Sequence, residues 1–358
     1  HNKGKLREEK MMKATMKAYV KQNAGPGASL LDIPVPVPGE GEVLIKVKAA
    51  AICGTDIHIH DWNAWAQGAV KNLPLVMGHE FSGEVVELGP GVKKLKKGDY
   101  VSGETHIPCG NCYQCLNGLQ HICANLLLPG VHRNGCFAEY IAYPEMCSVK
   151  IPESIAPEYG AVMEPLGVGV NAILEGNVGG ANIAVVGCGP IGIGMISVAD
   201  ALGAAKIFAL DISEYRLNLA GTCGAKHLIN PTKSDPVQAI REATGSVGVD
   251  AFFDASGNPE AIVQAFKFLR KGGHAHLVGL PSKPVSLDLV TDVIFKEATV
   301  HGYHGRKMFQ TWTAMMNLMD SGKVNLKPIV SHTMPLSSAD EAFSLIRGGN
   351  VSKVVLLP

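Results

Sequence analysis

The sequence predicts an α/β protein with a β-rich domain and a second domain built on a doubly wound parallel sheet. At 358 residues the chain is too long for one ordinary hydrophobic core, so about two domains are expected. The first third alternates like half-buried strands between frequent glycines and prolines. The middle of the chain instead alternates short apolar runs with helical spacing.

The β-rich domain is predicted from residues 42–48 and 81–88, whose apolar and polar side chains alternate as in strands with one buried face. Glycine and proline turns separate them, at residues 39–41, 89–91 and 97–99. This pattern favours a small barrel or sandwich that carries long functional loops.

The pattern changes after about Glu164. Short apolar runs predict strands at residues 183–186, 207–210, 227–230, 250–254 and 275–279. Helical spacing lies between them, and Ser213 is placed to cap one of these helices. Strands that alternate with helices predict a parallel sheet with helices on both faces.

The end of the chain returns to a mixed pattern, with helices expected at 311–321 and 339–347 and a strand at 353–357. We expect this segment to fold back onto the first domain. The predicted division is therefore residues 1–164 with 308–358 for the β-rich domain, and 165–307 for the parallel-sheet domain.

A glycine-rich turn lies between a predicted strand and a predicted helix, as Gly187-Cys-Gly189-Pro190-Ile191-Gly192. The first glycine permits a tight turn, the second lets a pyrophosphate approach the backbone, and the third lets helix and strand pack closely. The helix N-terminus adds donors and a positive dipole. A glycine turn without a ligand is the alternative, but the context predicts a dinucleotide site.

The choice of cofactor depends on Asp211, which ends the next strand 19 residues after Gly192. A carboxylate there can accept a hydrogen bond from a ribose 2′-hydroxyl and repels a 2′-phosphate, so NAD is predicted. Arg216 is a complication because an arginine can bind that phosphate; it can also be a solvated helix residue near the adenosine.

Four of the nine cysteines lie within fifteen residues, at positions 109, 112, 115 and 123. Four thiolates in one short loop can enclose a tetrahedral Zn²⁺ with no open position, as in a structural site. An iron–sulfur cluster is the main alternative. We interpret Cys109, Cys112, Cys115 and Cys123 as the ligands of a structural zinc.

A second, dispersed set contains Cys53, His79, Glu80 and Glu164. A catalytic zinc needs about three protein ligands and one open position. Each of these residues also has an ordinary interpretation, as a buried thiol, a loop histidine or a charge at the start of a helix. The residues alone therefore leave this second site open.

Composition argues against two other classes of protein. Lys plus Arg equals Asp plus Glu at 32 each, so the basic excess typical of nucleic-acid binders is absent. Residues 183–199 carry no charge, but glycines and a proline divide them, which predicts strand, turn and helix and not a membrane span. The polar first ten residues do not resemble a secretory signal, so a cytoplasmic location without a membrane partner is expected.

Taken together, these motifs resemble the zinc-dependent medium-chain dehydrogenases. The resemblance rests on Gly78-His79-Glu80 with Gly83, on the four-cysteine loop and on the glycine fingerprint, and it runs from about Met16 to Leu357. It implies a GroES-like catalytic domain, a Rossmann cofactor domain inserted within it, and an active site in the cleft between them.

Within that family, four stretches resemble the members that oxidise L-threonine. They are residues 61–67, residues 104–106, residues 164–167 and, most specifically, Gly305-Arg306-Lys-Met308-Phe309-Gln-Thr311-Trp312. The resemblance implies transfer of hydride from C3 of L-threonine to NAD⁺, which gives 2-amino-3-ketobutyrate. A bound zinc would lower the pKa of the substrate hydroxyl.

The resemblance also assigns roles to single residues. It makes Cys53, His79 and Glu164 the catalytic zinc ligands, with Glu80 able to exchange with Glu164 or water. Thr55 and His58 match the proton relay. The cofactor residues that it adds to the fingerprint are Gly279, Leu280, Tyr303 and His304, although the Tyr303-His304 pair is unusual. The candidate substrate residues are Trp65, His106 and Arg306, where Arg306 can bind a carboxylate, bind phosphate or form an internal ion pair.

A homotetramer is implied as well, through pairing of the cofactor domains near Leu287 and Thr299. The nearest alternative is a zinc-dependent polyol or 2,3-butanediol dehydrogenase, which shares every motif except the threonine-type stretches. A non-catalytic nucleotide-binding protein and a zinc-free NADPH reductase are disfavoured, because Cys53, His79 and Glu164 are all present.

Overall fold

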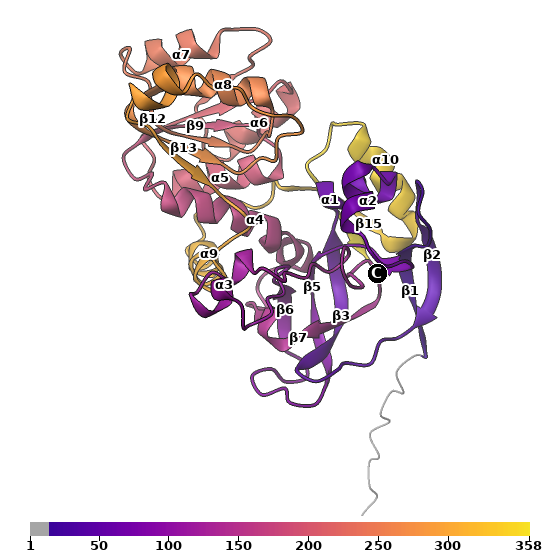
Figure 1. The fold of residues 1–358 in the computed structure, drawn as a ribbon. Coiled ribbons are helices and arrows are strands. Elements are labelled where there is room, and N and C mark those ends of the chain that lie inside the picture. Colours follow the sequence, from indigo (N-terminus) through magenta and orange to yellow (C-terminus); the bar gives the residue numbers. More distant parts are fainter. Residues whose placement is uncertain (1–13) are drawn as a thin grey trace, which may run out of the picture.

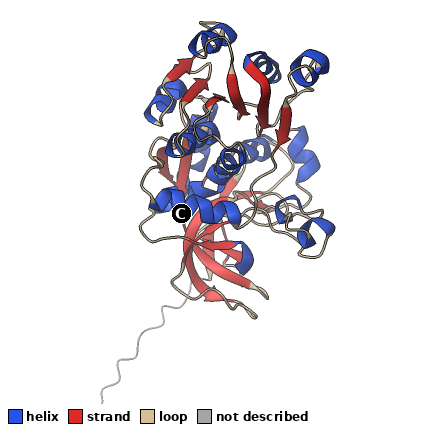
Figure 2. Ribbon diagram, turned by 90° about the vertical axis from the view of Figure 1, so that its left-hand side faces the viewer, coloured by secondary structure: helices blue, strands red, loops and turns tan. Residues whose placement is uncertain are grey.

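A computed structural model describes residues 14–358; the first thirteen residues of the predicted β-rich domain, and the expectation about a leader segment there, lie outside the described residues. Figure 1 shows two lobes joined through the long helix α4 (Pro157–Glu175). One lobe is dominated by antiparallel strands and the other by a helix-covered sheet, which Figure 2 shows in side view. The mixed α/β class predicted from the sequence is confirmed.

The first lobe contains two sheets. The larger has seven strands in the order β15–β16–β3–β5–β6–β8, with β7 also paired to β3. Its members are β3 (Glu42–Ala51), β5 (Glu80–Leu88), β6 (Tyr100–Gly103), β7 (Tyr140–Pro144), β8 (Ser148–Lys150), β15 (Val330–Pro335) and β16 (Lys353–Leu357). The smaller sheet joins β2 (Ser29–Pro34), β1 (Thr15–Lys21) and β4 (Leu75–Val76).

The chain returns to this lobe at its C-terminal end, as the sequence predicts. Strand β16 pairs antiparallel with β3, placing Val355 opposite Ala51 and Leu356 opposite Ala50. Besides α4, the α-helices outside the cofactor domain are α1 (Gly54–Asp61), α2 (Ala64–Ala69), α3 (Tyr113–Leu116), α9 (Gln310–Asp320) and α10 (Ala339–Arg347).

The second lobe holds a six-stranded, all-parallel sheet in the order β11–β10–β9–β12–β13–β14. This is the 3-2-1-4-5-6 order of a Rossmann domain. Its strands are β9 (Asn182–Val186), β10 (Lys206–Leu210), β11 (His227–Ile229), β12 (Val249–Asp254), β13 (Leu269–Leu277) and β14 (Thr299–Gly302). Its helices are α5 (Pro190–Ala201), α6 (Glu214–Thr222), α7 (Pro236–Ala243) and α8 (Pro259–Phe268).

Alternate residues of the central strand β9 point into two different cores. Ile183 and Val185 pack with α5 and α6, whereas Ala184 and Val186 pack with α7 and α8. Because successive side chains of a strand point to opposite faces, a continuous apolar run buries both. The uncharged segment 183–199 is therefore a strand, a turn and a helix.

The predicted division at residues 164 and 165 falls inside one continuous helix. Helix α4 packs both on β3, β5 and β6 of the first lobe and on α5 of the second. The core that forms around it extends across the two lobes, from Ala49 and Tyr100 to Ile183 and Phe253. A boundary within this helix stays a prediction.

No helix within residues 14–358 is long and apolar enough to cross a lipid bilayer.

Two valines, Val249 at the start of β12 and Val247 just before that strand, test the importance of the core that β12 forms with α7 and α8. Val249 is completely buried and Val247 is 62% exposed. We expect Val249→Ala to lower the free energy of unfolding by about 2 kcal/mol, because two methylene equivalents leave a packed core. Val247→Ala, the matched control, should change it by less than about 0.5 kcal/mol. Urea unfolding measures both, and equal effects would contradict the assignment of the core.

Candidate active site

The glycine-rich turn links β9 to α5, and glycine meets a different structural requirement at each of its three positions. Gly187 has φ = 91°, a backbone conformation that favours glycine. A Cβ on Gly192 would lie 1.9 Å from the carbonyl oxygen of Gly187, so helix and turn could not pack. A Cβ on Gly189 would meet no atom within 4 Å, because this residue borders open space. The fingerprint is thus built as the sequence predicts.

A cavity of about 520 Å³ opens beside this turn, and Gly187, Gly189, Asp211 and Arg216 line it. Asp211 follows β10 directly; one carboxylate oxygen accepts from the backbone N–H of Cys188 at 2.8 Å and the other from that of Ser213 at 2.9 Å. The Arg216 guanidinium lies 3.9 Å from the same carboxylate. The cavity therefore presents an oriented acid next to the phosphate-binding turn, as a nucleotide ribose requires.

The remaining predicted cofactor residues have other surroundings. Pro190 and Ile191 begin α5 beneath the turn, Gly279 packs against Gly257, and Leu280 is 88% exposed. None of these four lines the cavity. Nor do two residues that follow β14: the Tyr303 hydroxyl lies 2.8 Å from His276, and His304 lies 3.2 Å from the carbonyl oxygen of His121. Their contacts with a cofactor stay predictions.

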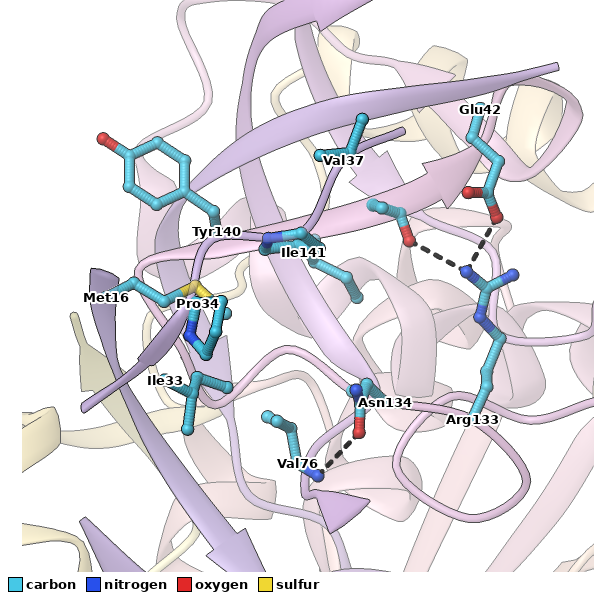
Figure 3. A pocket seen from close by; sticks show the side chains of 13 residues that line it. Met16, Ile33, Pro34, Val37, Glu42, Val76, Arg133, Asn134, Tyr140 and Ile141 are labelled. Atoms are coloured by element: carbon cyan, nitrogen blue, oxygen red, sulfur yellow. Dashed lines mark hydrogen bonds and ion pairs between the residues drawn. The ribbon is translucent and has the colours of Figure 1, made fainter. Parts of the chain in front are cut away.

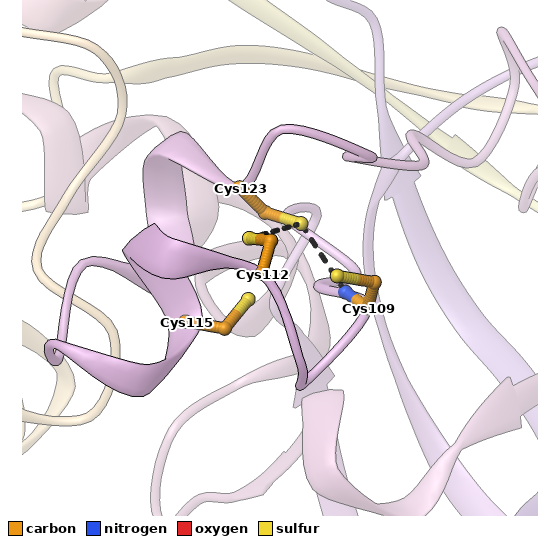
Figure 4. A group of neighbouring side chains, drawn as sticks. All are labelled: Cys109, Cys112, Cys115 and Cys123. Carbon is orange, nitrogen blue, oxygen red and sulfur yellow. Dashed lines mark hydrogen bonds between the residues drawn. The ribbon is translucent and has the colours of Figure 1, made fainter.

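The four clustered cysteines converge in the loop around α3, as Figure 4 shows. Their sulfur atoms lie within 4.8 Å of one another. The Sγ of Cys123 accepts hydrogen bonds from the backbone N–H groups of Cys109 and Asn125, each at 3.3 Å. Backbone donation from Asn111 lowers the pKa of Cys109 to about 6, which favours thiolate. No disulfide joins the nine cysteines, and four convergent thiols fit a tetrahedral zinc.

The second, dispersed set of candidate ligands also comes together, except that Glu80 and not Glu164 lies with Cys53 and His79. Ligand atoms of Cys53, His79 and Glu80 lie within 4.8 Å of one another. Cys53 caps the N-terminus of α1, and the buried Asp56 fixes it by accepting from its backbone N–H at 2.9 Å. The other oxygen of Asp56 accepts from Gly78 at 3.2 Å and lies 3.8 Å from Nδ1 of His79. One acid thus holds both segments of the group.

The charge state of this group indicates a place for a cation. Burial lowers the pKa of His79, but Asp56 and Cys53 outweigh burial and raise it to about 10. Its Nδ1 is buried without a hydrogen-bond partner. The same acidic surroundings favour a cation, and a thiol, an imidazole and a carboxylate are the types of ligand that zinc binds. These residues fit the predicted catalytic zinc.

Glu80 is tied to the end of the chain. Lys353, at the start of β16, donates to both carboxylate oxygens, at 2.6 Å to Oε2, and also to the carbonyl oxygen of Ile52 at 3.0 Å. Burial raises the pKa of Glu80 and the lysine opposes that rise. The pair neutralises a carboxylate that has no exposure to water.

Glu164 belongs to a neighbouring group with Glu104 and His106. Arg306, which is completely buried, donates to Glu164 and, at 2.9 Å, to Glu104. His106 and the Trp312 indole also contact Glu104, each at 2.6 Å. Burial would raise the pKa of Glu104, but Arg306 and His106 hold it at about 2. Arg306 is thus engaged in an internal ion pair, one of the three roles considered for it.

The predicted relay residues lie on α1 beside the Cys53 group. The Thr55 hydroxyl is 3.8 Å from Sγ of Cys53. His58 is exposed one turn further on, where its Nδ1 contacts the Asn63 amide at 2.9 Å. The Trp65 ring, 46% exposed, lies 6.0 Å from the His58 ring. These positions connect the metal group to the surface.

The sequence analysis assigned no role in the site to Asp56, Glu104, Lys353 or Trp312, although Glu104 and Trp312 lie in stretches that resemble the threonine-oxidising members. Only a charged residue within an apolar stretch of sequence could have pointed to such a residue, as Lys353 does in the C-terminal strand. Its partner is 273 positions away along the chain, so no local spacing could reveal the pair.

A second cavity, of about 390 Å³, lies on the outer side of the first lobe, between β1, β2 and β7 (Figure 3). Its arginine, Arg133, already donates to Glu42 at 2.7 Å and to the carbonyl oxygen of Ala142 at 3.1 Å. No group of candidate metal ligands lines it, so it lies apart from the site.

Comparison with known proteins identifies the class to which this fold and site belong. Residues 39–153 match the alcohol dehydrogenase GroES-like domain and residues 190–321 match the zinc-binding dehydrogenase domain. The chain therefore belongs to the zinc-binding alcohol dehydrogenase family.

Among curated proteins, the chain is similar to L-threonine 3-dehydrogenases. It is 46% identical to that of Bacillus licheniformis over 97% of this chain and 100% of the relative. The relative from Thermococcus kodakarensis is 44% identical over 97% of this chain and 99% of its own. Among solved structures, the 2R,3R-butanediol dehydrogenase of Bacillus subtilis has a TM-score of 0.86 at 30% identity, over 96% of this chain and 99% of that one.

The Arg306 network gives a prediction about stability. We expect Glu104→Gln to lower the free energy of unfolding by about 3 kcal/mol, because it leaves a buried guanidinium with one carboxylate instead of two. The matched control is Lys307→Gln, which breaks an exposed pair with Glu175 and should cost less than about 1 kcal/mol. Chemical denaturation measures both changes.

The same variant has an expected pH dependence. The folded pKa of Glu104 lies below the ordinary value, so its stabilisation is complete above the ordinary pKa of about 4.3 and is lost as the pH falls toward about 2. The difference between wild type and Glu104→Gln should therefore shrink below about pH 4. A difference that grows with acidity would contradict the assignment.

Proposed function

We propose that this dehydrogenase oxidises the 3-hydroxyl group of L-threonine with NAD⁺ and releases 2-amino-3-ketobutyrate and NADH. The observation that carries the proposal is the similarity of 43–46% over nearly the whole chain to several curated L-threonine 3-dehydrogenases. The site supports it with a dinucleotide cavity and two groups of zinc ligands. The polyol or butanediol alternative has weaker support, because the butanediol dehydrogenase is only 30% identical.

In this proposal the second lobe binds the cofactor and the first lobe binds the two zinc ions. The turn at Gly187–Gly192 and Asp211 hold the cofactor, and the carboxylate of Asp211 favours a ribose diol over a 2′-phosphate. Cys53 and His79 would hold the catalytic zinc, with Glu164 or Glu80 as the third protein ligand, and Cys109, Cys112, Cys115 and Cys123 would hold the structural one. When bound, zinc supplies a Lewis acid for an alcohol, and the nicotinamide supplies the hydride acceptor.

The residues around these groups move a proton and hold charge. Thr55 lies next to Cys53, and its hydroxyl can both accept and donate a hydrogen bond. His58, exposed on the same helix, can accept the released proton and pass it to water. Arg306 and Lys353 balance the carboxylates of Glu164 and Glu80, so the site can hold two acids without exposing either to water.

The proposed function predicts which substrate and cofactor give the fastest production of NADH. NADH production at 340 nm should be rapid with L-threonine and NAD⁺ and at least tenfold slower with sorbitol, 2,3-butanediol or NADP⁺. A chelator should abolish it and Zn²⁺ should restore it. Cys53→Ala should lose more than a thousandfold in turnover, while Cys223→Ala, which changes a buried cysteine outside both metal groups, should keep it. Turnover confined to a diol would reject the threonine assignment.

We also propose a homotetramer in the cytoplasm. Around the edge strand β14, Leu289, Ile294, Phe295 and Val300 are 44–69% exposed, a large apolar surface for a lone subunit. An open strand edge readily pairs with another copy. The absence of disulfides among the nine cysteines is compatible with a reducing compartment.

The assembly can be tested with one substitution. Phe295→Asp should convert tetramers to smaller species in light scattering, because it places a charge in the proposed interface. Ile212→Asp, at a 70% exposed apolar residue away from β14, is the control and should stay tetrameric. A wild-type monomer would contradict the proposal.

A further inference from the structure

Three histidines gather at the edge of the parallel sheet, away from both zinc groups. His274 and His276 lie on β13 and point to the same face, because they are two residues apart. His301 lies on the edge strand β14, directly opposite His276. One ring nitrogen from each of the three imidazoles lies within 4.8 Å of the others.

The spacing of two of these nitrogens matches a coordination sphere. Nδ1 of His274 lies 3.3 Å from Nε2 of His301. Two imidazole nitrogens at about 2.05 Å from a tetrahedral Zn²⁺ are separated by roughly 3.3 Å. The two residues come from different strands, so an ion between them would join the edge strand to its neighbour.

The third histidine has the environment of a metal ligand. His276 is completely buried, and its Nε2 has no hydrogen-bond partner. Its Nδ1 lies 2.8 Å from the Tyr303 hydroxyl, a contact that orients the ring as outer-shell partners orient metal-bound imidazoles.

We propose that His274, His276 and His301 form a third metal site, which binds one divalent transition-metal ion of the zinc, nickel or copper type. Imidazole nitrogens are suited to these ions. Three protein ligands leave a fourth position for water, on the side of the exposed His274. The ion bridges β13 and β14.

Ring stacking alone does not account for the arrangement. The His276 ring stacks on Phe253 at 4.5 Å and on His301 at 4.8 Å between centroids, which explains the parallel planes. It does not explain why a completely buried ring nitrogen lacks a hydrogen-bond partner, which is unfavourable. It also does not require Nδ1 of His274 and Nε2 of His301 to meet. An apolar ring would stack as well without that cost.

The experiment counts metal ions per chain in the purified holoenzyme. The protein is equilibrated with excess Ni²⁺, passed through a desalting column, and analysed by inductively coupled plasma mass spectrometry. Wild type should carry three divalent ions, two of them zinc. His274→Gln and His301→Gln, which change exposed and half-buried rings, should carry two. His332→Gln, an exposed histidine outside the cluster, should carry three.

A calorimetric titration with Ni²⁺ gives the affinity, and Tyr303→Phe should weaken it by 10–100-fold, because it removes the hydrogen bond that orients His276. Anomalous diffraction from a Ni²⁺-soaked crystal should place the ion between the three rings. A wild type with only two ions, or a third ion that both cluster variants retain, would overturn the proposal. Neither result depends on whether L-threonine is the substrate.

Discussion

The site depends on the two ion pairs that the buried guanidinium of Arg306 forms with Glu104 and Glu164. Arg306 follows the last strand of the cofactor sheet, Glu104 follows β6 of the first lobe, and Glu164 lies in the helix between them. Two charge-assisted contacts therefore join three separate segments at the place where the lobes meet. Buried ion pairs contribute little net stability, but a broken one leaves an uncompensated charge, so the pair fixes the arrangement more than it strengthens the fold.

Charged partners also hold the residues of the predicted catalytic zinc group. Asp56 orients Cys53 and faces His79, while Lys353 neutralises Glu80. Each of these three residues thus has a charged partner: Asp56 for Cys53 and His79, and Lys353, 273 positions away, for Glu80. Such partners fix the orientation of metal ligands, and rigid ligands lose less freedom when an ion binds. Glu164, the predicted third ligand, is instead held by Arg306, and Glu80 lies with Cys53 and His79.

Features encoded within a short stretch of chain could be predicted from the sequence. The glycine turn, the four-cysteine loop, the Ser213 cap and the C-terminal strand all lie where the pattern predicts them, because each depends on residues a few positions apart. Long-range pairs could not be predicted. Glu104 and Arg306 are 202 positions apart, and spacing carries no information about such a contact. The division between residues 164 and 165 stays a prediction. It lies inside α4, and a helix that packs on both lobes has no break in its sequence pattern that could mark a domain boundary.

The return of the chain to its first lobe affects how the enzyme is made. Lys353 lies 273 positions after Glu80 along the chain, yet it provides the counter-charge for that carboxylate beside Cys53 and His79. During synthesis the first lobe therefore lacks both its β16 strand and this charge until the whole cofactor domain has been made. The group of Cys53, His79 and Glu80 acquires its counter-charge late, whereas the four clustered cysteines are made within fifteen residues of one another.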